Sequence, residues 1–129
     1  MKYLTLAFIT TFFAQGALAE TVNYSCTMTK QDSHGWIAKE YAFQIDEAAK
    51  TAKAASSFQD SAEARFKNRG SKGYRLSWNL TERMAAGGDM RVRYQANLKT
   101  SDNTVTVRMA FVHADFANKP FGSGVCTIK

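Results

Sequence analysis

The sequence predicts an all-β protein, a small antiparallel up-and-down β-barrel or barrel-like sandwich of about 7–8 strands closed by a terminal disulfide. Three observations support this: apolar and polar residues alternate strictly between residues 74 and 112, hairpin-length connectors separate the alternating runs, and one cysteine lies near each end of the exported chain. The 129 residues are 45% hydrophobic and 22% charged, which suits one globular domain and excludes a large or multidomain enzyme.

The first 19 residues have the layout of an export signal. One lysine precedes an apolar stretch over residues 3–14, and small residues follow at the positions that a signal peptidase accepts before Glu20. The stretch is too short for a membrane anchor, which needs roughly 20 apolar residues, and no cysteine follows the cleavage point for lipidation. We therefore expect residues 1–19 to be a cleaved signal peptide and residues 20–129 to form one periplasmic or secreted bacterial domain without a membrane span.

The clearest strands lie in the second half of the chain. Residues 74–80, 90–98 and 104–112 each place apolar side chains at every second position, which is typical of half-buried antiparallel strands. The polar or glycine-containing segments 81–89 and 99–103 have the length of hairpin connectors.

The first half follows the same plan less regularly. Strands are expected over residues 24–29 and 36–45 and at 62–67, with connectors at 31–35, 46–50 and 68–72. The inward side chains of the whole sheet would then be apolar and aromatic: Trp36 or Ile37, Tyr41, Phe43, Tyr74, Trp78, Met90, Tyr94, Met109 and Phe111.

The alanine-rich segment 47–66 allows two interpretations. Ala48, Ala52, Ala55 and later apolar residues fall at helical spacing, with Asp46 as a possible N-cap. The same segment also divides into two short strands, which is the interpretation favoured here because it preserves the alternation of hairpins.

Two cysteines in a small exported domain most often pair. A bond between Cys26 and Cys126 would staple the first and last strands and remove the two exposed edges of the sheet. It would also set a register in which opposite residue numbers add up to 152, so that Met28 faces Gly124. The two cysteines do not form a CxxC motif, so no redox role is expected.

The sequence offers little for catalysis or metal binding, so we expect neither an enzyme nor a metal or other cofactor. His113 and Asp115 would share a strand face, but the second histidine lies far away in sequence, at His34. Residues 121–124, Phe-Gly-Ser-Gly, precede a cysteine-bearing strand instead of the helix that a nucleophile elbow requires, and are expected to form a turn that allows close approach. The carboxylates show no pairing suited to acid–base chemistry.

Positive charge is concentrated in one region. Residues 65–93 carry eight Lys or Arg residues against Glu82 and Asp89, a net charge of +6 that equals the charge of the whole chain. Four arginines fall on the polar side of the predicted strands: Arg75, Arg91, Arg93 and Arg108. Guanidinium groups bind phosphate and carboxylate in a bidentate manner, so this side is a candidate anion-binding face.

The partners that suit such a face are an anionic polysaccharide, lipopolysaccharide or an acidic protein. Nucleic acid is disfavoured because the aromatic residues alternate to the opposite side and leave no stacking platform. The alternative interpretation of the charge is a solvated surface that keeps a monomer soluble.

Two other functions remain open. The apolar and aromatic inward set could surround a small hydrophobic ligand, as in carrier barrels, although side chains can fill the interior of eight short strands. An exported inhibitor of another protein is the second possibility.

The segment Tyr24-Ser25-Cys26, together with the export signal and the chain length, resembles the bacterial inhibitors of C-type lysozyme, which are small exported β-barrels. The resemblance implies the same fold class. The Ser/Lys loop with which that family binds lysozyme has no match in this sequence, and a basic face would repel a cationic lysozyme, so the resemblance does not extend to the target.

Overall fold

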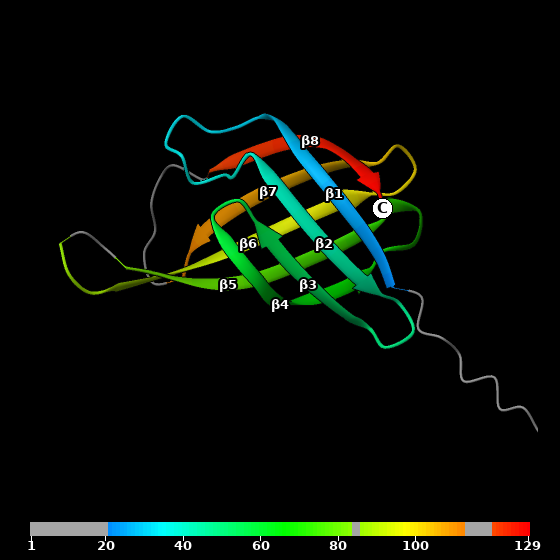
Figure 1. The fold of residues 1–129 in the computed structure, drawn as a ribbon, viewed down its shortest axis with the longest axis horizontal. Helices are drawn as coiled ribbons and strands as arrows, with labels where there is room; N and C mark the ends of the chain where they lie inside the picture. The colour runs from blue at the N-terminus through cyan, green and yellow to red at the C-terminus, as the bar shows by residue number, and fades with distance from the viewer. Residues whose placement is uncertain (1–20, 84–85, 113–119) are drawn as a thin grey trace, which may run out of the picture.

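Eight antiparallel strands close into a barrel in the computed structural model, which describes residues 21–83, 86–112 and 120–129 (Figure 1). The predicted signal peptide, His113 and Asp115 lie outside the described residues. The elements are β1 Thr21–Lys30, β2 Glu40–Asp46, β3 Thr51–Ser56, β4 Gln59–Asn68, the 3-10 turn η1 Gly70–Lys72, β5 Tyr74–Arg83, β6 Asp89–Lys99, β7 Thr104–Phe111 and β8 Phe121–Ile128.

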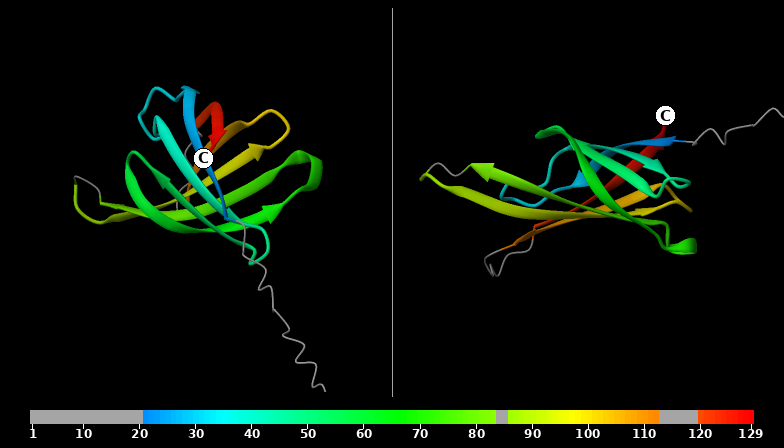
Figure 2. Two further views of the ribbon diagram at one scale, coloured as in Figure 1. Left: turned by 45° about the vertical axis from the view of Figure 1, so that its right-hand side comes forward. Right: turned by 90° about the horizontal axis from the view of Figure 1, so that it is seen from below.

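The strands follow one another around the barrel in chain order, and β8 returns to pair with β1 (Figure 2). Cys26 lies opposite Cys126 and Met28 lies opposite Gly124, which confirms the predicted register. A bulge then shifts the pairing so that Lys30 meets Ser123. The prediction of an up-and-down barrel is therefore confirmed, and the structure selects the closed barrel over the sandwich.

The disulfide joins Cys26 and Cys126 directly across the β1–β8 seam, and both residues are buried. Their separation of 100 residues makes the closed loop nearly as long as the domain. In the chain-entropy model a loop of this length stabilises the folded state by roughly 4–5 kcal/mol. Since small domains are stable by about 5–15 kcal/mol, the bond is a major part of the fold's stability.

The core lies inside the barrel and takes alternate residues from every strand. Of the predicted inward residues, Ile37, Tyr41, Phe43, Trp78, Tyr94 and Met109 are buried, while Trp36, Tyr74, Met90 and Phe111 are partly buried and pack against them. Their rings are in mutual contact: Trp78 stacks on Tyr94 at 5.6 Å between centroids and meets Phe43 edge-on at 5.8 Å. The barrel is therefore held together by an aromatic core as well as by its strands.

Residues 51–68 form the hairpin of β3 and β4, so the two-strand interpretation of the alanine-rich segment is confirmed. The Asp46 side chain does accept a local hydrogen bond, from Ala49 N–H at 3.0 Å, but the turn it stabilises leads into a strand. Ala52 and Ala54 are buried opposite Ile45 and Phe43. Alanine suits these positions because the large side chains of β2 already fill the interior.

The predicted strand over residues 36–45 begins only at Glu40. Residues 31–39 form a loop instead, and both Ile37 and Ala38 are buried, which a strand with one solvent-facing side cannot achieve. Asp32 accepts from Ile37 N–H at 3.2 Å, and Tyr94 O–H donates to Trp36 C=O at 2.9 Å. The loop closes one end of the barrel (cyan, upper left in Figure 1).

Two predicted connectors are paired strand in part or in whole, and the described residues 86–88 remain a connection between β5 and β6. The segment 81–89 was expected to be a connector, but β5 continues to Arg83 and β6 begins at Asp89, directly opposite each other. Residues 121–124 were expected to form a turn, yet they are the first half of β8. The expected close approach is real: a Cβ on Gly124 would lie 2.8 Å from the Cα of Met28.

We expect Gly124→Ala to destabilise the protein by about 2 kcal/mol, because the added methyl group collides with the β1 backbone at the closing seam. Urea unfolding measures the loss. Ser123→Ala is the matched control, since the Ser123 side chain is only half-buried on the outer side of the same strand. Equal stability of the two variants would contradict the close packing of β8 on β1.

Alkaline pH should weaken the fold. Burial raises the pKa of Tyr41 to about 12, against the hydrogen bond from Ala38 N–H, which lowers it; burial also raises the pKa of Tyr94. Because unfolded tyrosine titrates near pH 10, the unfolded chain releases protons that the native state retains. The contribution of these tyrosines to the free energy of unfolding should therefore be constant below about pH 9 and fall between about pH 10 and pH 12.

Urea titrations at a series of pH values test this. The variant Tyr41→Phe should show a shallower fall with pH than the wild type, whatever its stability at neutral pH. An identical pH dependence in both proteins would show that Tyr41 does not contribute.

Candidate functional site

The structure brings the four predicted arginines to the outer side of adjacent strands. Arg75 lies on β5, Arg91 and Arg93 on β6, and Arg108 on β7, each between neighbours whose side chains point into the barrel. Arg91, Arg93 and Arg108 are exposed and Arg75 is half-buried. The alternation that buries Leu76, Val92, Tyr94 and Met109 is what turns these arginines outward.

The register divides the four arginines into two places. Arg108 is opposite Gln95, so it is a diagonal neighbour of Arg93, at a Cα separation of about 7–8 Å. Arg91 lies two positions before Arg93 on β6. Arg75 is opposite Asn97, and therefore lies farther along the sheet than the other three.

Two further cations join Arg75. On β4, Lys67 is directly opposite Arg75 and Arg65 is opposite Ser77. The sequence prediction of the anion-binding face did not include them, although both occupy outward positions of the predicted strand 62–67, and that alternation was the available signal. We call the outer side of β4–β7 the cationic face, made up of Arg65, Lys67, Arg75, Arg91, Arg93 and Arg108.

Asparagine side chains hold two of the guanidinium groups. Arg75 donates from Nε to Asn97 Oδ1 at 3.1 Å, and Arg93 donates from Nε to Asn79 Oδ1 at 3.2 Å. In both cases the partner is the residue directly opposite on the neighbouring strand. Bonding through Nε orients the plane of the guanidinium and leaves its two Nη groups as donors for an anion.

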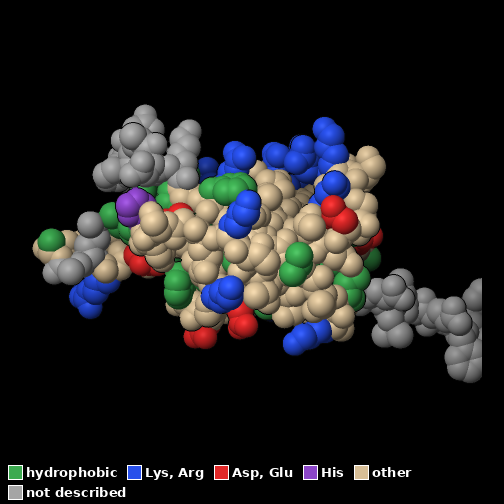
Figure 3. Space-filling view, turned by 90° about the horizontal axis from the view of Figure 1, so that it is seen from above, with side chains coloured by type: hydrophobic (Ala, Val, Ile, Leu, Met, Phe, Trp, Pro, Cys, Tyr) green, Lys and Arg blue, Asp and Glu red, His purple; other side chains and the backbone are tan. Residues whose placement is uncertain are grey.

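No described acidic side chain forms an ion pair with the cationic face, although Glu63 and Asp89 lie two positions from Arg65 and Arg91 on the same strands. Within the described ranges, one Lys–carboxylate pair lies within 4.0 Å, Lys99 with Asp102 at 3.5 Å, in the β6–β7 turn. There the Thr104 hydroxyl, which donates to Asp102, and then Lys99 lower the pKa of the Asp102 carboxyl. Lys and Arg side chains gather along the edge of the molecule at β6 and β7, at the top of Figure 3.

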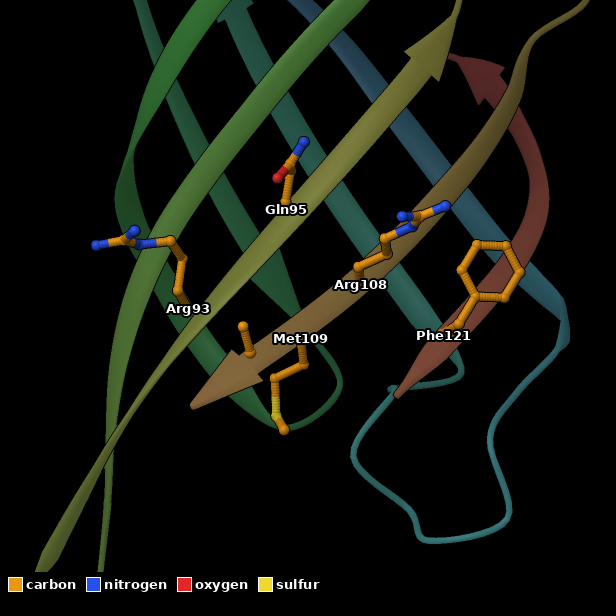
Figure 4. A pocket seen from close by; sticks show the side chains of 6 residues that line it. Arg93, Gln95, Arg108, Met109 and Phe121 are labelled. Carbon is orange, nitrogen blue, oxygen red and sulfur yellow. The ribbon is translucent and has the colours of Figure 1, made fainter. Parts of the chain in front are cut away.

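A hollow of about 340 Å³ opens on the cationic face between Arg93 and Arg108. Gln95, Ala110 and Phe121 line it as well. Figure 4 shows Arg108 leaning toward the Phe121 ring, Arg93 pointing to the opposite side, and Gln95 between them. The Arg108 Cζ lies 5.5 Å from the centroid of that ring, a cation–π distance.

Phe121 corrects one expectation from the sequence. The aromatic side chains were expected to alternate to the inner side, but Phe121 is 42% exposed on the outer side at the start of β8. The sequence did not indicate an outward Phe121 because residues 121–124 were expected to form a turn and not a strand. The hollow therefore combines two guanidinium groups with one aromatic surface.

The barrel interior offers much less room. The inner hollow that reaches Trp78 and Tyr94 has a volume of about 10 Å³, which is space for about one water molecule. In the described part of the chain, no group of three His, Cys, Asp or Glu side chains is placed to hold a metal ion. No helix among the described residues is long and apolar enough to cross a membrane.

Comparison with known proteins gives no relative: no family model, curated protein or solved structure matches this chain. The function must therefore be inferred from the residues of the cationic face.

The opposed pair Lys67 and Arg75 should weaken the fold slightly, because like charges directly across a strand pair repel. We expect Lys67→Glu to stabilise the protein by about 0.5 kcal/mol at low salt, and the gain to shrink as salt increases.

Lys53→Glu is the matched control. Lys53 lies opposite Glu63, so the same change of charge there replaces an attraction by a repulsion and should destabilise the protein. Urea unfolding at low and high salt measures both variants. Effects of the same sign would show that net charge, and not the local pairing, is responsible.

Proposed function

We propose that this protein is an exported, non-catalytic binding module whose cationic face binds an anionic partner of the bacterial envelope. One observation carries the proposal: six Lys and Arg side chains share one side of a closed sheet, and none of them is within 4.0 Å of a described carboxylate. Charges of one sign held on a rigid surface attract a ligand of the opposite sign and raise its rate of association.

The spacing of the cations favours an extended polyanion over a single small ion. Arg93 and Arg108 line opposite sides of the hollow, so each can engage an anionic group of its own on a ligand that lies between them. Arg65, Lys67 and Arg75 form a second group farther along the strands. A ligand with repeated phosphate or carboxylate groups can contact both groups at once.

Envelope components of this chemistry are acidic polysaccharide, the phosphates of lipopolysaccharide and acidic protein. The hollow's single exposed aromatic ring, Phe121, suits the apolar surface of a sugar ring or an aliphatic side chain better than a row of stacked bases. Nucleic acid therefore stays outside the proposal.

Retention on heparin resin tests the face with a defined polyanion. The variant Arg75→Gln/Arg93→Gln/Arg108→Gln should elute at lower salt than the wild type. The slope of log affinity against log salt should become shallower by about one for each guanidinium that contacts the polymer, as expected for counterion release.

A control variant removes three positive charges, from the β2–β3 turn, from β3 and from the C-terminus: Lys50→Asn, Lys53→Ala and Lys129→Ala. Asparagine is used at Lys50 because that residue has a φ of 55°. The control should retain most of its heparin affinity, and equal losses in both triple variants would overturn the proposal. Binding to lipopolysaccharide, alginate and polyglutamate then separates phosphate, glycan carboxylate and protein as the source of the anion.

A further inference from the structure

Strand β5 has a free edge. Over Tyr74–Ser77 it pairs with β4 on one side and β6 on the other, but Trp78–Arg83 pair with β6 alone. The hairpin of β5 and β6 extends beyond the rest of the barrel at the left of Figure 1. The backbone of residues 78–83 therefore has a side on which no described strand pairs with it.

Strand β4 diverges from β5 at the same place. Its first part, Gln59–Ala64, pairs with β3 and not with β5. An outer hollow of about 260 Å³ marks the divergence and is lined by Glu63, Arg65, Asn79 and Arg93 among others. The small inner hollow described above lies on the other side of Trp78.

Two buried polar atoms lack hydrogen-bond partners where β4 and β5 diverge. Trp78 Nε1 and Gln59 Oε1 make no hydrogen bond within the described structure, although Trp78 is only 3% exposed. Both residues line the inner hollow. A buried donor without an acceptor costs about 1–3 kcal/mol, so the two atoms favour a small polar group, such as one water molecule, in the hollow that they share.

The side chains around the β4–β5 divergence indicate what kind of ligand would fit beside β5. Phe58 is 58% exposed and lines the inner hollow together with Leu80 and Glu82. On the outer side, the bond from Arg93 to Asn79 draws that guanidinium toward β5 and its free edge. Arg65 and the exposed Arg83 add positive charge there, against the carboxylates of Glu63 and of Asp89, which lies opposite Arg83.

We propose that the free edge of β5, residues 78–83, binds an extended segment of a partner protein as an added strand. In such an added strand, main-chain hydrogen bonds provide affinity and alternate side chains provide specificity. The inward side chains of the segment would be apolar, to contact Phe58 and Leu80. Its outward side chains would be acidic, to meet Arg93 and Arg83.

This site differs from the cationic face because it uses the backbone edge of β5 and the apolar side chains of Phe58 and Leu80. The two share Arg65 and Arg93, whereas Arg75 and Arg108 belong to the face alone and Phe58 to the edge alone. The two proposals can therefore fail independently.

A synthetic peptide in which Val and Glu alternate, with both ends capped, is the probe, and calorimetric titration of the full exported chain is the measurement. In an added strand, successive peptide amides point alternately toward the barrel and toward solvent. N-methylation of one alternate set should weaken binding about tenfold or more, while methylation of the other set should have little effect. No binding of the peptide, or equal effects of the two methylated forms, would overturn the proposal.

Variants locate the site. Phe58→Ser should weaken peptide binding, whereas Val125→Ser, which removes a side chain of similar exposure (54%) from β8, should not. Arg75→Gln/Arg108→Gln should lower heparin retention and leave peptide binding intact. Hydrogen exchange should show new protection of amides in residues 78–83 when the peptide is present. Protection of those amides without peptide, together with a dimer in sedimentation, would show that a second copy of the chain covers the edge and would overturn the proposal of a separate partner.

Discussion

The pairing of β1 with β8 is the constraint on which the rest of the structure depends. It closes the sheet, and the Cys26–Cys126 bond holds the two strands in register across the seam. Because the sheet is closed, one side of every strand faces the interior and the other faces solvent, so alternate side chains are buried and exposed. The aromatic core and the cationic face are the two sides of that single arrangement.

The cationic face shows how charge can be concentrated without unfolding the sheet. Asn97 and Asn79 stand opposite Arg75 and Arg93, so neutral acceptors occupy positions where a second cation would repel. Lys67, opposite Arg75 on the other side, has no such arrangement. An anion bound between these strands would offset that repulsion, and the same interaction would join binding to stability.

Closed barrels protect their edges, and this barrel does so along most of its circumference. One stretch of unpaired strand edge lies where β4 and β5 diverge. There the main chain of β5, two unpartnered buried atoms and an exposed phenylalanine occur together. The two proposals therefore concern neighbouring parts of the same hairpin: charge recognition on its outer face and backbone pairing at one edge.

By itself the sequence determined the strand-rich fold, the pairing of the cysteines with its register, and the outward side of Arg75, Arg91, Arg93 and Arg108. The strands and the outward side of the arginines follow from local alternation, whereas the cysteine pairing follows from the presence of two cysteines near the ends of a small domain, and the register follows from that pairing. Tertiary structure alone decided where strands end. Residues 36–39 fold over the barrel end because hydrophobic burial there outweighs pairing.

Phe121 lies outside because β8 starts earlier than its glycines suggest, and the grouping of Lys67 with Arg75 depends on which strands become neighbours. The free edge of β5 likewise depends on how far two strands stay together in space. Such long-range pairing leaves no signal in the local pattern of either strand.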